Sequence, residues 1–310
     1  MEKEIILWVV FWTVFLVVLI LDLFVFFRKH SEINVGKAFF LSFTWMIIAL
    51  FYSVLIFLYE GTTSGVEYIT AYFVEWSLSV DNLFVFLVIF TFFSVPKEYQ
   101  HQVLFWGVLG AIVFRGIFIF LGVSLVNQFS WLFVVFGVFL VYTAFVLLFK
   151  KDDEQVKIEN RFAYKLARKL FNITPDYING YFFKKIDGKI WATPLFLCLI
   201  MIESTDILFA IDSIPAVLGI STHPLVVFTS NIFAVMGLRS MYFALAGIMG
   251  IFKFLKYGLS IVLAYIGLKM IVKELLHIKI DSFISLLIVL SILGISVLLS
   301  LIIKDKRAGV

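Results

Sequence analysis

The chain is organised as long apolar runs separated by short polar segments. Nine of these runs reach membrane-spanning length, at about residues 5–27, 37–59, 69–93, 102–125, 129–149, 192–219, 224–249, 256–276 and 282–303. A helix needs about 20 apolar residues to cross the hydrocarbon core of a bilayer, where it satisfies its own backbone polar groups. The pattern therefore predicts an all-α, polytopic membrane helix bundle with about nine transmembrane helices.

The composition agrees with this class. The chain has 310 residues, of which 63% are hydrophobic and 15% are charged, against about 25% charged residues in typical soluble domains. The first apolar run is too long for a signal-peptide core, which predicts a retained span. The net charge of +4 lies mainly in loops and does not indicate nucleic-acid binding. Cys198 is the single cysteine, which excludes an intrachain disulfide and a cysteine-based metal site.

The basic residues predict the orientation of the chain. Nineteen lysines and arginines lie in the C-terminal tail and the loops on its side, whereas two, Lys3 and Lys279, lie in clear loop positions on the other side. Cytoplasmic loops of membrane proteins carry an excess of Lys and Arg. We therefore expect a multi-pass protein of the cell membrane, with its N-terminus outside and its C-terminus in the cytoplasm.

Acidic residues interrupt two of the apolar runs. One run carries Glu75 and Asp81, and another carries Glu203, Asp206 and Asp212. Each carboxylate at the centre of a membrane helix costs roughly 2.5–3.5 kcal/mol on insertion scales, so five cost on the order of 12–17 kcal/mol unless paired, protonated, hydrated or bound to a cation. These two segments are the best indicators of function in the sequence.

The two acidic segments also predict an internal repeat. Ser79-Val-Asp81-Asn-Leu-Phe resembles Ser204-Thr-Asp206-Ile-Leu-Phe, and an arginine follows each aspartate after 34 and 33 residues. A tyrosine then follows each arginine, giving the pairs Arg115 with Arg239 and Tyr142 with Tyr265. The third to fifth helices thus match the sixth to eighth. Because each copy has three spans, the copies cross in opposite senses, as in secondary transporters with a midplane substrate site.

The repeat divides the chain into five parts. Residues 1–68 hold two peripheral transmembrane helices, 69–149 the first repeat, 192–276 the second repeat, and 277–310 the last helix and a cytoplasmic tail. Residues 150–191 form the longest polar segment. We expect a cytoplasmic amphipathic helix or ordered linker there, and a solvated connector is favoured over a regulatory role.

Helical periodicity places some of the acidic residues on common faces. Glu75, Ser79 and Asn82 share one face of the first acidic helix, and Asp81 lies about 120° from Glu75. In the second acidic helix, Glu203, Asp206 and Ser213 form a stripe and Asp212 points elsewhere. Pro215 predicts a break after Asp212, which would help that residue to join a common cavity.

The chemistry of these side chains favours a hard cation. Carboxylate, amide and hydroxyl oxygens suit Mg²⁺, Ca²⁺ and Mn²⁺ better than Cu⁺ or Zn²⁺. Arg115 and Arg239 are interpreted as each neutralising one buried carboxylate, and Lys269 as doing the same or extending toward the outer face. Buried ion pairs that fix helix register are the structural alternative. Three basic groups against five acids favour a cation path, although protonation would also remove the excess charge.

At these residues the chain resembles the TerC family of integral membrane proteins. The resemblance covers nearly the whole chain and is most specific at Glu75-Trp-Ser-Leu-Ser-Val-Asp81-Asn82 and at Glu203-Ser204-Thr-Asp206-Ile-Leu-Phe-Ala-Ile-Asp212-Ser-Ile-Pro215, and Asn231 and Arg239 also fit. The family is named for tellurium resistance, is related to LysE-type transporters and includes members linked to manganese export.

The resemblance implies Mn²⁺ efflux across a bacterial inner membrane. Its candidate ligands are Glu75, Asp81, Asn82, Glu203, Asp206 and Asp212. Residues expected to support the site are Ser79, Ser204, Asn231, Arg115, Arg239 and Lys269.

The leading hypothesis is a secondary transporter that exports Mn²⁺ or a similar divalent cation, with protons as a candidate coupling ion. We expect no enzyme activity and no permanently bound cofactor, because the metal is cargo. The sequence lacks GxxxxGK[ST], which disfavours direct ATP drive. The expected partners are the lipid bilayer, the divalent metal ion and protons, with no nucleic acid. Membrane protein partners or a homo-oligomer stay open.

Two other functions compete with this hypothesis. The first is tellurite or envelope-stress resistance through partner proteins, with the helices as a scaffold, although an acid-lined cavity matches the tellurite oxyanion poorly. The second is an intramembrane aspartyl protease, in which two membrane aspartates share a proton. The protease is disfavoured because no GxGD motif precedes Asp81 or Asp206.

Overall fold

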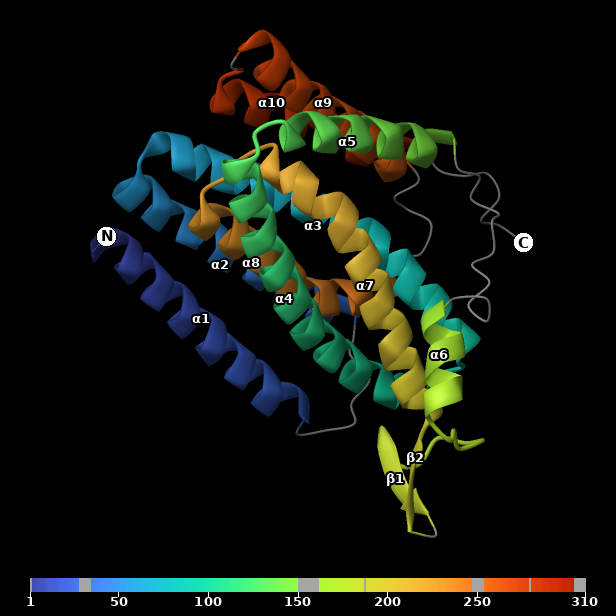
Figure 1. Ribbon diagram of the computed structural model, residues 1–310. Coiled ribbons are helices and arrows are strands. Elements are labelled where there is room, and N and C mark those ends of the chain that lie inside the picture. The colour runs from blue at the N-terminus through green and yellow to red at the C-terminus, as the bar shows by residue number, and fades with distance from the viewer. Residues whose placement is uncertain are drawn as a thin grey trace.

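A computed structural model describes residues 2–27, 35–149, 162–186, 188–246, 254–278 and 280–303 (Figure 1). These residues form ten helices and one β-hairpin. The elements are α1 (Glu2–Phe27), α2 (Val35–Glu60), α3 (Thr62–Phe92), α4 (Lys97–Gln128), α5 (Leu132–Phe149), α6 (Phe162–Leu170), β1 (Phe183–Ile186), β2 (Lys189–Ala192), α7 (Pro194–Leu218), α8 (Pro224–Ala246), α9 (Leu255–Leu276) and α10 (Ser282–Ile302).

Every predicted span coincides with a long helix, so the predicted membrane helix bundle is confirmed. Within the described residues, seven helices are long and apolar enough to cross a membrane: α1, α2, α4, α5, α7, α8 and α10. Two further long helices, α3 and α9, are not in that set. Both carry charge within their length, such as Glu75 in α3 and Lys269 in α9. That these two also cross the membrane stays a prediction.

Local sequence sets the helix boundaries. Gly61 has a φ of 90°, which suits a residue without Cβ, and it separates α2 from α3. As a result α3 begins at Thr62, earlier than the predicted 69. Pro194 and Pro224 occupy the first positions of α7 and α8, where a missing N–H costs nothing. Asp281 caps α10 by accepting hydrogen bonds from the backbone N–H groups of Phe283 and Ile284 at 2.9 and 3.2 Å.

The helix α7 differs from the prediction at Pro215. The proline lies inside the helix, which continues to Leu218 without interruption, and the backbone N–H of Gly219 donates to the Pro215 carbonyl at 3.0 Å. The expected break after Asp212 is therefore wrong for the described backbone. A proline so close to the end of a helix removes one backbone hydrogen bond and does not require the chain to leave the helix.

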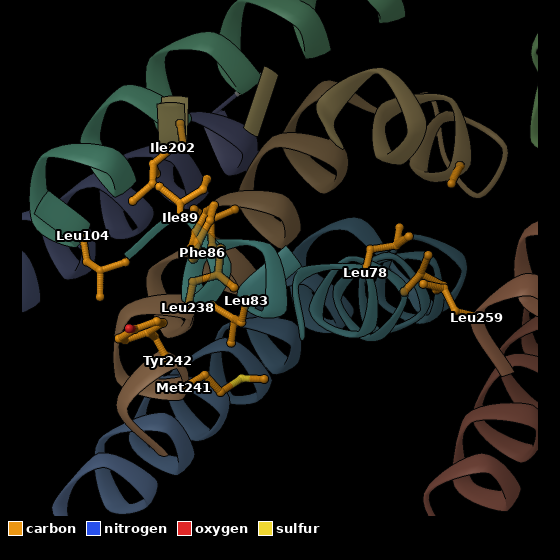
Figure 2. Close-up of a cluster of buried hydrophobic side chains, with 14 of the residues drawn as sticks. Leu78, Leu83, Phe86, Ile89, Leu104, Ile202, Leu238, Met241, Tyr242 and Leu259 are labelled. Atoms are coloured by element: carbon orange, nitrogen blue, oxygen red, sulfur yellow. The ribbon is translucent and has the colours of Figure 1, made fainter. Parts of the chain in front are cut away.

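The core is built around α8. Residues 225–242 of this helix are all buried, and α2, α3 and α4 pack around it. One of the two buried apolar clusters lies where α3 meets α8, and Figure 2 shows Leu83 and Phe86 of α3 close to Leu238, Met241 and Tyr242. The other cluster joins α1 and α2 to α8. The acidic helices α3 and α7 are thus held among neighbours rather than at the periphery.

The main helix contacts correspond when the two predicted repeats are exchanged, although the smaller contacts of α4 with α5 and of α7 with α9 have no counterpart of similar extent. The helix α3 packs against α8 and α9, and its predicted counterpart α7 packs against α4 and α5. Each helix also touches its own counterpart, in the pairs α3 with α7, α4 with α8 and α5 with α9. The tyrosines of the predicted match differ, however, because Tyr142 is exposed whereas Tyr265 shares a hydrogen bond with Ser285.

The polar segment between the repeats is ordered over its described part. It contains the short helix α6 and an antiparallel hairpin in which Phe183 pairs with Ala192 and Ile186 with Lys189. The hairpin was not predicted, although the pair Asp187-Gly188 in the sequence is a strong hairpin signal. Residues 150–161 lie outside the described part of the chain. Figure 1 shows α6 and the hairpin at the end of the molecule opposite α5, α9 and α10.

The close approach of α5 to α9 gives a test of the fold. A Cβ on Gly137 would lie 2.7 Å from the carbonyl oxygen of Gly267, so Gly137→Ala must push the two helices apart. We expect the substitution to lower stability by about 1–3 kcal/mol, seen as a lower melting temperature of the purified protein in detergent. Gly294→Ala is the matched control, because nothing lies within 4 Å of its Cβ position. Equal melting temperatures for both variants would contradict this packing.

Candidate functional site

The buried guanidinium of Arg115 is the centre of the candidate site. It projects from the middle of α4 and is held by side chains from three other helices. Its Nε and Nη2 atoms donate to the two carboxylate oxygens of Asp206 on α7, at 3.1 and 3.0 Å. Its Nη1 atom donates to Glu75 Oε1 on α3 and to Asn231 Oδ1 on α8, the latter at 3.3 Å. One cation therefore joins α3, α4, α7 and α8.

All members of this group are removed from solvent. Arg115, Glu75 and Asn231 are 0% exposed and Asp206 is 3% exposed. The bidentate contact with Asp206 is the strongest geometry available to an arginine and a carboxylate. Glu75 shares the remaining face of the guanidinium with the amide of Asn231. Two carboxylates thus face one guanidinium, so the group has one negative charge in excess when both acids are ionised.

Several polar atoms around this group have no hydrogen-bond partner. Among the described residues, they include Glu75 Oε2, Ser79 Oγ, Ser213 Oγ and Asn231 Nδ2, all of them buried. Leaving a buried polar atom unpaired costs about 1–3 kcal/mol, so native proteins rarely collect several without a reason. Three of the four atoms are oxygens, which are available to a cation or to water.

Glu203 lies next to this group on α7, one turn before Asp206. Its side chain is partly buried and its Oε2 atom has no partner. It packs directly against Gly110 of α4, where a Cβ would fall on the carboxylate itself. Gly110 was not singled out from the sequence. The sequence feature that could have identified Gly110 is its small size at a position five residues before Arg115.

The structure says less about the other predicted ligands, Asp81, Asn82 and Asp212, and about the predicted supporting residue Ser204. Asn82 is 6% exposed on α3. Ser204 uses its hydroxyl to donate to the Met201 carbonyl at 3.0 Å, within its own helix. Asp81 and Asp212 lie in α3 and α7, but their side chains are outside the part that the structure describes. Within the described residues, no three His, Cys, Asp or Glu side chains gather as a metal-binding group.

Arg239 and Lys269 occupy different environments. Arg239 lines a small cavity that Asp206 also lines, together with apolar residues of α3, α4, α7 and α8. Its guanidinium lies 5.8 Å from the centre of the Phe105 ring. Lys269 donates to Ser285 Oγ at 2.8 Å, at the junction of α9 and α10. Lys269 is therefore not among the side chains that meet at Arg115.

Comparisons with known proteins agree on the class of this chain. A family model described as the integral membrane protein TerC family matches residues 60–308. An uncharacterized membrane protein of Myxococcus xanthus is 43% identical over 97% of this chain and 93% of its own length. A Salmonella typhi protein with the provisional name membrane-bound redox modulator Alx is 40% identical over 97% of this chain and 95% of its own. No solved structure matches significantly.

Removing the guanidinium should destabilise the bundle severely. Arg115→Gln leaves Glu75 and Asp206 without their shared cation, and breaking a buried ion pair in this way costs about 3–5 kcal/mol. Adding Asp206→Asn removes one of the two orphaned charges. We therefore expect the double variant to melt at a higher temperature than Arg115→Gln alone. Lys97→Gln, at an exposed lysine of the same helix, is the control for loss of a positive charge.

The order of melting temperatures is the decisive comparison. If the double variant melted at or below the temperature of Arg115→Gln, the two side chains would not interact as described. Equal melting temperatures for the separate variants Arg115→Gln and Lys97→Gln would likewise contradict a buried ion-pair group at Arg115.

Proposed function

The chain belongs to the TerC family of integral membrane proteins, and on that premise we propose that it is a secondary transporter exporting a divalent metal cation. Mn²⁺ is the first candidate and protons are the proposed counter-ion. The observation that carries this proposal is the buried Arg115 group, in which carboxylates from two different helices converge on one positive charge. A cluster of charged side chains inside a membrane bundle costs free energy, and this cost is best explained by a cation that crosses the membrane through the cluster.

The donor set supports a hard divalent cation as substrate. Glu75, Asp206 and Glu203 supply carboxylate oxygens, and Ser79 and Ser213 supply buried hydroxyls without partners. Oxygen donors of these types suit Mn²⁺, Mg²⁺ and Ca²⁺. Asp81, Asn82 and Asp212 are proposed as further ligands along the path. The choice of Mn²⁺ among hard cations rests on the family resemblance.

Arg115 has a specific role in the proposed cycle. It occupies the place between Glu75 and Asp206 that a transported cation would take, so when no metal is bound it donates hydrogen bonds to both carboxylates and offsets one of their two negative charges. A divalent ion must displace the guanidinium from at least one of them. When the ion leaves, the carboxylates regain Arg115 or take up protons, and this exchange makes antiport with protons chemically natural.

An inverted repeat of α3–α5 and α7–α9 is part of this proposal. It is supported by the matching positions of aspartate and arginine in the sequence and by the contacts of α3 with α8 and α9, which correspond to those of α7 with α4 and α5. In transporters built this way, one half rocks against the other around a central site. Arg115 and Asp206 come from opposite halves, so their contact would change during such a movement. The proposed orientation has the N-terminus outside and the C-terminus in the cytoplasm of a bacterium.

Transport in proteoliposomes tests the function and the site together. Purified protein should accumulate Mn²⁺ when a pH gradient is imposed, and Asp206→Asn should reduce the initial rate at least about tenfold, because a buried charged ligand is lost. Glu203→Gln gives a second variant at a less buried carboxylate. Asp176→Asn is the matched control, because Asp176 is exposed in the polar segment between the repeats.

The outcomes separate the hypotheses. If well-folded Asp206→Asn and Glu203→Gln took up Mn²⁺ at the wild-type rate, the assignment of these carboxylates to the transport site would be contradicted. Absence of uptake for Mn²⁺, Mg²⁺ and Ca²⁺ by the folded wild-type protein would contradict transport and favour a role through partner proteins.

Gly110 provides an independent test of the placement of Glu203. In Gly110→Ala the new methyl group displaces the Glu203 carboxylate, so we expect a clearly lower Mn²⁺ uptake rate with little change in the amount of folded protein. The control is Gly237→Ala on α8, where the nearest atom to an added Cβ is 3.8 Å away. Unchanged uptake in Gly110→Ala would show that the position of Glu203 does not matter for transport.

A further inference from the structure

The exposed surface of α6 and the adjoining hairpin combines positive charge with apolar side chains. Residues 162–192 contain six basic residues and two acidic ones. All six basic side chains are exposed: Lys165, Arg168, Lys169, Lys184, Lys185 and Lys189. No part of the transport proposal uses this surface.

The helix α6 presents its charges in an ordered way. Lys165 and Lys169 are four residues apart, as are Leu166 and Leu170, so each pair lies along one line of the helix. Leu166 and Leu170 are 40% and 65% exposed, whereas Ala167 is buried toward the bundle. A short helix with adjacent basic and apolar stripes is typical of a helix that lies at a membrane surface.

The hairpin continues the same surface. Lys184 pairs with Trp191 across the two strands, so both side chains lie on one face of the hairpin. Tryptophan and lysine together are typical of the boundary between lipid and water. The other face is anchored, because the ring of Phe183 packs against Phe196 of α7 with centroids 4.3 Å apart.

Contacts with α7 set the depth of this surface relative to the bilayer. The helix α7 has 25 residues, which corresponds to roughly 37 Å and exceeds the hydrocarbon core of about 30 Å. Its length therefore allows an end of α7 to reach the headgroup layer. The helix α6 packs against α7, and Phe171, just after α6, contacts the ring of Phe196 near the start of α7. The lysines of α6 thus lie beside the first turns of α7, and the proposal below places them at the level of the lipid headgroups.

The chain between α6 and the hairpin is also held against other helices. The Tyr177 hydroxyl donates to the carbonyl of Phe93 at the end of α3, at 2.6 Å, and burial raises the pKa of this phenol. The backbone of Gly180 packs against Tyr99 and Gln102 at the start of α4. The surface is therefore formed before any ligand arrives, which lowers the entropic cost of binding.

We propose that α6 and the base of the hairpin, through Lys165, Lys169 and Lys184, form a binding surface for the phosphate headgroups of anionic lipids. The positive charge complements the phosphates, and Leu166, Leu170 and Trp191 contact the acyl boundary. Each lysine near an anionic membrane surface contributes favourably, and the attraction weakens as salt screens it. This inference is independent of which ion the protein transports.

Protease protection in nanodiscs tests the proposal. Full-length protein is placed in discs of phosphatidylcholine alone or of phosphatidylcholine with phosphatidylglycerol, and chymotrypsin cleavage within 162–192 is followed by mass spectrometry. We expect cleavage about tenfold slower in the anionic discs. The variant K165Q/K169Q/K184Q should lose this difference. The matched control K3Q/K37Q/K97Q removes three exposed lysines elsewhere and should keep it.

Several outcomes would overturn the proposal. They are equal cleavage in both kinds of disc, unchanged protection in K165Q/K169Q/K184Q, and loss of protection in the control variant. Equal protection by millimolar inorganic phosphate in neutral discs would assign the surface to free anions instead of lipid. Because the readout does not involve transport, a negative result leaves the transport proposal untouched.

Discussion

The ion pair of Arg115 with Asp206 and Glu75 is the interaction on which the rest of this structure depends. Two carboxylates in a membrane bundle are tolerable because a guanidinium on the adjoining helix reaches both of them. That contact requires α3 and α4 both to pack against α7, and it requires α8 to bring Asn231 to the same point. One buried charge group therefore links the packing of α3, α4, α7 and α8 to the candidate chemistry.

The same group explains why small residues and polar atoms collect nearby. Gly110 leaves room for Glu203, which stands one turn from Asp206 on α7. Ser79, one turn after Glu75 on α3, and Ser213 of α7 have buried hydroxyls without hydrogen-bond partners. A group built only to fix helix register would gain by satisfying these atoms or replacing them with apolar side chains. Retaining them is consistent with a site that holds a cation for part of a cycle.

The sequence predicted the membrane helices well because apolar runs of membrane length have few other solutions in lipid. It also identified Glu75, Asp206 and Arg115 as relevant, because charged residues are rare in such runs. It could not show that Arg115 reaches across to Asp206 of the other proposed repeat, since this depends on how α4 packs against α7. Lys269 illustrates the same limit, because its partner Ser285 comes from α10. The break expected at Pro215 was wrong because the position within the helix decides what a proline does, and the hairpin was overlooked despite Asp187-Gly188.

The central claim is that a transported cation competes with Arg115 for the two carboxylates. Anomalous X-ray diffraction from crystals grown with Mn²⁺ tests it most directly, because the signal locates manganese without assumptions about ligands. The account predicts a manganese peak at oxygen-ligand distance from Glu75 or Asp206, with the guanidinium of Arg115 moved away from at least one of them. A manganese peak elsewhere in the bundle, with Arg115 still bound to both carboxylates, would contradict it.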